Sequence, residues 1–233
     1  MVKKKELLLS YFWPQIVEKS SSRWNPVLEV KLNAGRYHLD SANTNYSYGS
    51  LYIMFRRLFR RLKPEWGSIK DVLMLGFGTG SVARLINNYN KDCRIDGVEV
   101  DEKVIELGRK YFSIDELTNV TIYCDSAASF MERCNKKYDL VIIDVYIDLN
   151  VPGEVETEEF LSHVRDALNP GGMVIFNKFI NSKESRDQLP VLEERYKKIF
   201  GNLRVMTVMT TGRIFVAEAL DYLEIKNKSM CKK

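Results

Sequence analysis

Hydrophobic positions change their spacing along this chain, and from residue 71 onward two kinds of spacing alternate. Short continuous apolar runs are typical of parallel strands covered on both faces, and apolar residues three or four apart are typical of helices. Strands are predicted over residues 71–75, 95–99, 120–123, 140–143, 173–177, 203–208 and 213–217. Helices are predicted over residues 81–86, 101–112, 126–134, 157–168 and 183–200. This alternation predicts an α/β fold with a mostly parallel seven-stranded sheet, helices on both faces and an antiparallel edge strand.

The connections between these elements carry their own signals. Glycine and proline at 169–172 predict a turn into the strand that starts at 173, and residues 210–212 predict a tight turn between the last two strands. Residues 145–155 form the longest connection in the predicted core, so we expect a lid or substrate loop there.

The first 63 residues follow another pattern. Partial alternation over 27–32 and 36–40, with a glycine turn between them, predicts a β-hairpin. Residues 41–49 are polar and aromatic and predict a loop. Residues 50–63 place apolar side chains at intervals of three and four, and Pro64 follows, which predicts an amphipathic helix. Residues before 26, with an aromatic cluster and a serine run, give no clear pattern.

These patterns predict three parts along the chain: an N-terminal segment over 1–63, a nucleotide-binding domain over 64–220 and a basic tail over 221–233. The 233 residues, 45% of them hydrophobic and 28% charged, are enough for one sizeable core. No apolar run reaches the roughly 18–20 residues of a membrane span. The leucines at 7–9 are too few for a signal peptide, so we expect a cytoplasmic protein.

Cysteine and histidine are scarce, which argues against a metal centre. The four cysteines show no CxxC spacing, and the chain has only two histidines. Reduced, mostly buried thiols and no metal site are therefore expected. The net charge of +4 is mildly basic, and it includes one concentrated run of cations at Arg56, Arg57, Arg60, Arg61 and Lys63.

The stretch with the most chemical information is 71–80. A buried strand stops there at Gly76, Gly78 and Gly80, and a helix begins at Ser81. Glycines let the backbone turn sharply and come close to a ligand that a Cβ would block. The helix N-terminus then presents free N–H groups to whatever occupies the turn, which is the geometry of a nucleotide site.

Carboxylates follow three further strands, at Glu99, Asp125 and Asp144. In open α/β sheets ligands bind at the carboxyl ends of the strands, so these acids are expected to line one crevice. Glu99 is placed to accept hydrogen bonds from both ribose hydroxyls. Asp125 is placed to accept one from an adenine amino group, with a backbone amide near Ser126 reading the ring nitrogen. Each acid alone is also consistent with a solvated strand end, and Asp125 with a helix cap.

Four segments resemble the spermidine synthase family. They are residues 73–80, residues 98–112, Cys124-Asp125 and residues 138–144, and the hairpin up to Ser41 is similar to the N-terminal β-segment of that family. The resemblance covers residues 27–220. It implies a Rossmann-like methyltransferase fold of the kind that uses S-adenosylmethionine, preceded by a small β-hairpin segment.

The resemblance also implies roles for individual residues. Asp144 is expected to take the proton from an attacking amine, because an ammonium is not a nucleophile. The other expected catalytic residue is Tyr146. The expected donor-binding residues are Gly76, Gly78, Thr79, Gly80, Glu99, Val100, Asp125 and Ser126. The expected acceptor-binding residues are Tyr46, Tyr48, Tyr52 and Asp148. An aromatic wall suits a cationic acceptor, although each tyrosine also suits hydrophobic packing.

The chain departs from the family pattern at three places. Thr79 stands where the family has an aspartate that holds the amine of decarboxylated S-adenosylmethionine, which favours S-adenosylmethionine itself as the donor. Residues 144–148 replace Asp-Ser-Ser-Asp-Pro, so the second acid is missing or shifted by one position. The glutamine expected soon after Asp40 is also absent. Aminopropyl transfer and methyl transfer to a small amine-type acceptor therefore both stay open, with either nucleoside as donor.

Other classes of function fit the sequence less well. An RNA methyltransferase would grip phosphates with the arginines at 56–61, but no aromatic residues alternate with them, so a solvated face or an acidic partner surface is favoured and nucleic acid is not expected. A non-catalytic S-adenosylmethionine-binding protein is a further alternative. A nicotinamide-dependent oxidoreductase is disfavoured because the turn reads Gly-x-Gly-x-Gly. The expected partners are small-molecule substrates and a second copy in a homodimer, without a membrane.

Overall fold

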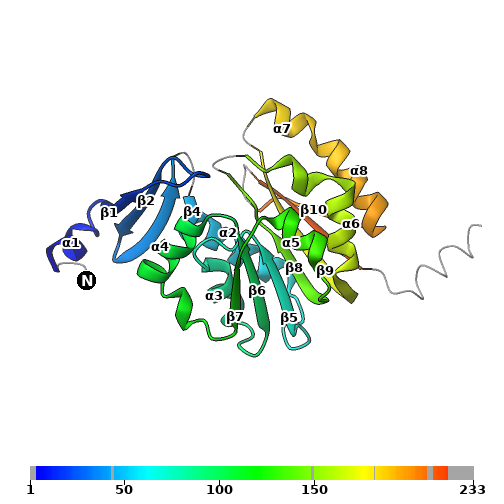
Figure 1. Cartoon of the computed structure of the whole chain (residues 1–233), viewed down its shortest axis with the longest axis horizontal. Helices are drawn as coiled ribbons and strands as arrows, with labels where there is room; N and C mark the ends of the chain where they lie inside the picture. The colour runs from blue at the N-terminus through cyan, green and yellow to red at the C-terminus, as the bar shows by residue number, and fades with distance from the viewer. Residues whose placement is uncertain (1–3, 43–44, 148–149, 181, 209–211, 220–233) are drawn as a thin grey trace, which may run out of the picture.

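The computed structural model describes residues 4–42, 45–147, 150–180, 182–208 and 212–219. They form two sheets, one of four strands near the N-terminus and one of seven strands that makes the larger body (Figure 1). The small sheet stands beside the body, and the helices of the body lie on both faces of the large sheet (Figure 1).

The small sheet has the order β1-β2-β3-β4 and is antiparallel throughout. Helix α1 precedes it at Lys4–Leu9. Its strands are β1 Gln15–Ser20, β2 Leu28–Asn33, β3 Arg36–Ser41 and β4 Asn45–Ser47. The hairpin predicted from alternation is confirmed as β2 and β3. The prediction of a loop over 41–49 is wrong in part, because residues 45–47 form β4 and pair with β3. A strand of three residues is too short to show an alternating pattern in the sequence.

The large sheet has the order β10-β11-β9-β8-β5-β6-β7. Its strands are β5 Asp71–Leu75, β6 Arg94–Glu99, β7 Val120–Cys124, β8 Tyr138–Ile143, β9 Leu168–Phe179, β10 Arg204–Met206 and β11 Gly212–Glu218. The strands from β5 to β9 are parallel, and β11 runs antiparallel to both of its neighbours at one end of the sheet. The predicted fold class is therefore confirmed, with the antiparallel pairings at that edge.

The helices of the body lie where the three-to-four spacing predicts them. They are α2 Gly49–Leu62, α3 Ser81–Asn87, α4 Glu102–Phe112, α5 Ala127–Arg133, α6 Glu158–Asp166, α7 Lys183–Asp187 and α8 Leu189–Phe200, with short 3-10 helices at Ile114–Glu116 and Gly153–Glu156. One layer of the core joins α2, α3 and α4 to the sheet, and a second layer joins α5, α6 and α8 to its other face.

Two boundaries differ from the prediction, each for a local reason. The helix predicted over 183–200 is two helices that meet at Gln188, because Pro190 occupies the first turn of α8 and lacks the N–H that a continuous helix needs. The turn predicted over 169–172 lies inside β9, where the backbone of Gly171 and Gly172 bonds to Ala219. The predicted turn at 210–212 and the tail 221–233 lie mainly or wholly outside the described residues, and the division into three parts stays a prediction.

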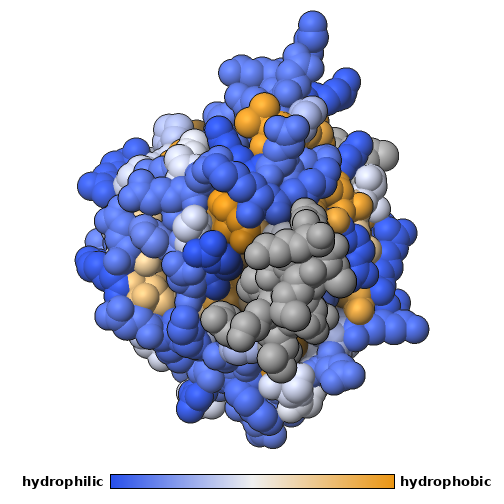
Figure 2. All heavy atoms as spheres, turned by 90° about the vertical axis from the view of Figure 1, so that its right-hand side faces the viewer, coloured by the Kyte–Doolittle hydropathy of each residue, from blue (hydrophilic) through white to orange (hydrophobic). Residues whose placement is uncertain are grey.

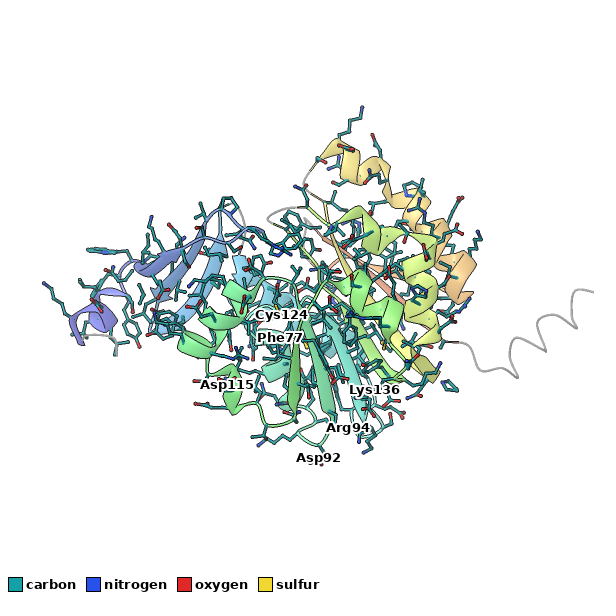
Figure 3. The ribbon with its side chains drawn as sticks, in the orientation of Figure 1. Phe77, Asp92, Arg94, Asp115, Cys124 and Lys136 are labelled. Atoms are coloured by element: carbon teal, nitrogen blue, oxygen red, sulfur yellow. The ribbon has the colours of Figure 1, made fainter. Side chains whose placement is uncertain are left out.

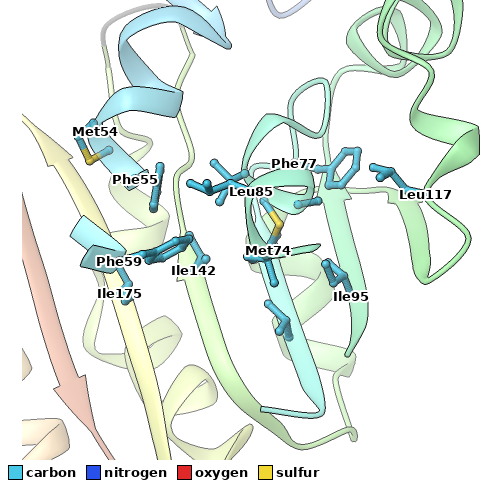
Figure 4. Close-up of a cluster of buried hydrophobic side chains, with 14 of the residues drawn as sticks. Met54, Phe55, Phe59, Met74, Phe77, Leu85, Ile95, Leu117, Ile142 and Ile175 are labelled. Carbon is cyan, nitrogen blue, oxygen red and sulfur yellow. The ribbon is translucent and has the colours of Figure 1, made fainter. Parts of the chain in front are cut away.

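Helix α2 packs against the large sheet through buried apolar side chains. Met54, Phe55 and Phe59 of α2 lie over Ile142 of β8 and Ile175 of β9 (Figure 4), and all five side chains are at most 5% exposed. Burial of such side chains contributes roughly 1.5–3 kcal/mol each to folding, so this contact fixes the helix firmly over the carboxyl-terminal half of the sheet.

The two ends of the parallel strands have different chemistry. At the amino ends, Lys136 lies between Asp71 and Asp96 at 2.9 Å from each, and Arg94 also pairs with Asp71. Arg94 and Lys136 lie at the end of the sheet opposite to Phe77 (Figure 3). The charged side chains at the amino ends of the strands pair with one another. The carboxyl ends are therefore the better place for a ligand.

The surface that faces the viewer in Figure 2 is mostly hydrophilic, with apolar side chains in small separate patches. Among the described helices, none combines the length and the apolar character that crossing a bilayer requires.

Candidate active site

The glycine turn is fastened to the neighbouring strand by its own backbone. The N–H groups of Gly76 and Phe77 both donate to the carbonyl oxygen of Val98 at 2.9 Å, and the N–H of Gly78 donates to Glu99 Oε2 at 2.8 Å. Gly76, Gly78 and Gly80 all have positive φ, which favours glycine. The turn is therefore held open at the carboxyl end of β5.

Glu99 is a carboxylate buried at the centre of this arrangement. Its side chain is 3% exposed, and its second oxygen accepts a hydrogen bond from the N–H of Asp101 at 3.1 Å. Burial raises the pKa of Glu99 to about 7, although the backbone N–H groups of Gly78, Val100 and Asp101 favour the charged form. A buried carboxylate that keeps free lone pairs suits the paired hydroxyls of a ribose.

The raised pKa of Glu99 predicts a pH-dependent stability. The unfolded chain loses this proton near pH 4.5, and the folded chain keeps it up to about pH 7, so stability is full below the lower value and is lost as the pH rises through the higher one. We expect the free energy of unfolding to fall by about 3 kcal/mol over that window through this group. Urea unfolding of Glu99→Gln should lack this part of the dependence, and the exposed Glu65→Gln should keep it. Equal pH dependence in both variants would contradict the assignment.

Asp125 and Ser126 lie at the end of β7. The Ser126 hydroxyl accepts from the N–H of Ser129 and caps α5, so the cap is Ser126 and Asp125 is left for another role. Asp125 accepts from the N–H of Ser126 at 2.8 Å and pairs with Arg133, and its side chain is half-buried at the pocket.

This division of roles predicts different effects for the two residues. Ser126→Ala should lower the free energy of unfolding by about 1 kcal/mol through loss of the cap, with donor affinity nearly unchanged. Asp125→Asn should weaken donor binding with little change in stability. Thermal unfolding and calorimetry of the two variants measure both quantities, and a reversed pattern would mean that the two roles are exchanged.

Asp144 ends β8 and faces the same pocket. Its side chain is half-buried, and burial raises its pKa to about 6, while the Asn177 amide that donates to Oδ1 at 2.9 Å favours the charged form. Near neutral pH the carboxylate is therefore ionised and able to accept a proton. Asn177 at the end of β9 fixes its orientation.

Tyr146 is held beside Asp144 by the backbone of β9. Its hydroxyl donates to the carbonyl oxygen of Asn177 and accepts from the N–H of Phe179 at 3.0 Å. Burial and the nearby Asp144 raise the pKa of this phenol well above 10. Tyr46 in turn donates to the carbonyl oxygen of Tyr146 at 3.1 Å, so β4 of the small sheet closes this side of the pocket.

These residues line one continuous pocket at the carboxyl ends of the strands. Its described lining consists of Tyr46, Ser47, Ser50, Leu51, Met54, Gly76, Phe77, Gly78, Ser81, Val82, Val98, Glu99, Val100, Asp125, Ala127, Asp144, Val145, Tyr146, Asn177, Phe179 and Gly212. Phe77 and Cys124 mark this end of the sheet in Figure 3. The pocket thus combines three carboxylates, a glycine turn and an apolar floor.

Several predicted site residues lie elsewhere. Tyr48 stacks on Tyr52 and on Phe112 and packs against the core, outside the pocket lining. Thr79 is fully buried, and its hydroxyl finds no partner among the described residues. Asp148 lies outside the described residues. The roles predicted for these residues, for Gly80 and for Ser126 stay predictions.

The structure adds residues that sequence reasoning missed. Ser50, Leu51 and Met54 come from helix α2, on which only Tyr52 was predicted to contact a substrate, and Asn177 and Phe179 come from the end of β9. The one available signal was position, since β9 is a further parallel strand whose carboxyl end meets the same crevice.

The poorly patterned N-terminal residues also support the site. The Asn25 amide donates to Asp101 Oδ2 at 2.8 Å, and the Ser22 hydroxyl donates to the same oxygen. Asp101 caps α4 and donates its N–H to Glu99. The N-terminal segment is therefore linked to the buried carboxylate through a chain of two hydrogen bonds.

The pocket fits a nucleoside better than a metal ion. Val98, Val100 and Ala127 line the pocket together with Glu99 and Asp125, and apolar side chains beside two carboxylates suit a flat base that carries polar groups. No group of three or more His, Cys, Asp or Glu side chains in the described ranges is arranged to hold a metal.

Comparisons with known proteins find one family and several relatives. The model of the spermine/spermidine synthase domain family matches residues 62–232. The chain is 32% identical over 151 residues to a "probable polyamine aminopropyl transferase" of Bifidobacterium longum, which covers 64% of this chain and 33% of that protein. It is 28% identical over 160 residues to a polyamine aminopropyltransferase of Vibrio vulnificus, covering 64% of this chain and 52% of that protein.

A solved structure shows the same fold. A probable spermidine synthase from Corynebacterium glutamicum superposes with a TM-score of 0.72 at 18% identity, over 89% of this chain and 82% of that one. The chain spans between a third and about half of the length of the two curated relatives. The family model nevertheless covers most of the sequence, including every strand of the large sheet. The chain belongs to the spermine/spermidine synthase family.

Proposed function

We propose that this protein is a transferase that moves an aminopropyl group from decarboxylated S-adenosylmethionine to an amine acceptor. The observation that carries the proposal is the position of Asp144. It is an oriented carboxylate with a pKa raised to about 6, in the same pocket as the carboxylates of Glu99 and Asp125. A nucleoside donor held by Glu99 and Asp125 would present its sulfonium end toward Asp144.

In this mechanism each residue has one task. Glu99 accepts hydrogen bonds from the ribose, and Asp125 accepts one from the base. Asp144 accepts the proton of the acceptor ammonium, which frees the nitrogen lone pair. The nitrogen then forms a bond to the propyl carbon next to sulfur, the C–S bond breaks with its electrons going to sulfur, and methylthioadenosine leaves. Positioning of the two substrates supplies much of the rate.

The names of two curated relatives, a probable polyamine aminopropyl transferase and a polyamine aminopropyltransferase, support this substrate class. The acceptor is expected to be a small amine, with Tyr46 and Tyr146 forming part of its wall. A homodimer and a cytoplasmic location are expected as well, and neither enters the mechanism.

A second candidate is methyl transfer from S-adenosylmethionine, and the glycine turn favours it. The hydroxyl-bearing residues Ser47, Ser50 and Ser81 line the pocket, and Ser81 begins the helix that follows the glycine turn. Hydroxyl groups donate to a carboxylate, which the decarboxylated donor lacks. No acidic side chain stands at the Thr79 position to hold the donor amine.

Binding calorimetry with the two nucleosides and methylthioadenosine tests the proposal. Tighter binding of decarboxylated S-adenosylmethionine, followed by release of methylthioadenosine in the presence of diamines, is the expected result. Tighter binding of S-adenosylmethionine would replace aminopropyl transfer by methyl transfer. If the protein bound both donors but transferred neither group to any amine, it would be a binding protein, and if it bound none of the three, the pocket assignment would be wrong.

A further inference from the structure

The outer face of α2 is strongly basic. Arg56, Arg57, Arg60 and Arg61 are all exposed, and Lys63 follows at the C-cap. The sequence of α2 contains no aspartate or glutamate. Arginines four positions apart repel each other and weaken a helix, so the arrangement works against the stability of α2 itself.

The described part of the chain does not neutralise these charges. Arg61 donates to the carbonyl oxygen of Thr207 at 2.9 Å, and none of the four arginines forms an ion pair with a described residue. Helix α8 shows the contrast, because Lys197 pairs with Glu193 and Lys198 pairs with Glu158. The charge on α2 is therefore available to an external anion.

An aromatic pair lies at the C-terminal end of this helix. Phe59 of α2 packs against Trp66 with ring centroids 5.0 Å apart, and Trp66 stacks on Tyr89 at 4.8 Å. Tyr89 is 39% exposed. The sequence alone gives no aromatic residue near the arginines on the outer face, because Tyr89 follows the end of α3 and only the fold brings its ring within 6.1 Å of the Phe59 ring of α2.

We propose that the outer face of α2, together with Tyr89, binds single-stranded nucleic acid through its phosphates. Guanidinium groups match phosphate oxygens with two parallel hydrogen bonds, which explains why all four residues are arginine. An exposed ring beside a basic surface stacks bases without regard to sequence, which favours a single strand over a duplex. The inner face of the same helix lines the candidate active site through Leu51 and Met54, so the strand would dock behind the pocket wall.

Fluorescence anisotropy with a short labelled single-stranded RNA of mixed sequence tests the proposal. Four phosphate contacts predict that the logarithm of the binding constant falls with the logarithm of salt concentration with a slope of about −3. The variant R56Q/R57Q/R60Q/R61Q should bind at least about 100-fold more weakly and lose the slope. The pair R56Q/R60Q should show an intermediate loss.

Two controls make the result specific. The variant K183Q/R186Q/K197Q/K198Q removes the same four charges from α7 and α8, taking the net charge from +4 to 0 as well, and should bind like the wild type. Y89L should weaken single-strand binding about tenfold and leave duplex binding unchanged. The α7/α8 variant and Y89L should both bind the donor as the wild type does, and this measurement confirms that they are folded.

Three results would overturn the proposal. One is a quadruple α2 variant that binds RNA as well as the wild type does. Another is an equal loss in the α7/α8 control, which would show a general charge effect. The third is polyglutamate binding as tightly as RNA at the same salt concentration, which would assign the face to an acidic protein instead.

Discussion

Replacing Asp144 with asparagine is expected to lower kcat by about 1,000-fold, because the variant has no group to take the proton from the acceptor amine. The shape of the side chain and the hydrogen bond with Asn177 are retained in this variant, so donor binding should persist. The measurement is steady-state transfer with the amine that shows the highest turnover, combined with donor calorimetry on the same preparation.

The pH profile gives an independent check of this role. Burial raises the pKa of Asp144 to about 6, and only the ionised form accepts a proton, so the rate should rise tenfold per pH unit below that value and level off above it. Asp125→Asn is the matched control, since it should raise the donor KM and leave the profile in place. A wild-type rate that does not change with pH across this range would contradict the assignment of Asp144 as base.

Replacing Gly76 with alanine is expected to destroy the site and to destabilise the fold by at least about 4 kcal/mol. Gly76 has φ +86°, and a Cβ there would lie 2.1 Å from the backbone carbonyl oxygen of Asp144. Backbone on a central strand cannot move aside as a flexible side chain does, so either β5 separates from β8 or the turn refolds. Urea unfolding and donor calorimetry should both report the loss.

Gly171 is the control that separates the clash from backbone strain. Its φ of +74° is similar, but no atom lies within 4 Å of the position of a Cβ. Gly171→Ala should therefore cost only about 1 kcal/mol, from the left-handed conformation alone. If the two variants lost equal stability, the close approach between the glycine turn and Asp144 would have no energetic importance.

The parallel sheet could be predicted because its central strands, β5 and β8, are buried on both faces and leave continuous apolar runs. Residues 71–75 and 140–143 show this most clearly, and both are strands of the structure. The small sheet could be predicted only in its hairpin. Strand β1 is partly exposed and has no clear period, and β4 has three residues, so their pairing comes from tertiary contacts with β2 and β3.

The candidate site could be predicted where chemistry and position coincide. Glu99, Asp125 and Asp144 each follow a predicted strand, and the fold brings them to one pocket. Asn177 also ends a strand, but a single amide carries no signal of its own. The pocket-facing part of α2 could not be predicted for another reason. Met54 belongs to the same apolar repeat as the side chains of α2 that only pack against the core.

The order of strands in the large sheet also has a consequence for folding kinetics. Strand β5, which carries the glycine turn, pairs with β6 on one side and with β8 on the other. Synthesis proceeds from the N-terminus, so β6 and β7 are made before β8, and the unpaired N–H and C=O groups along one edge of β5 wait for residues 138–143 to emerge. Such non-local parallel pairing is slow and leaves an edge open to wrong partners. The strand at the centre of the finished site is thus open to misassembly while the chain is being made.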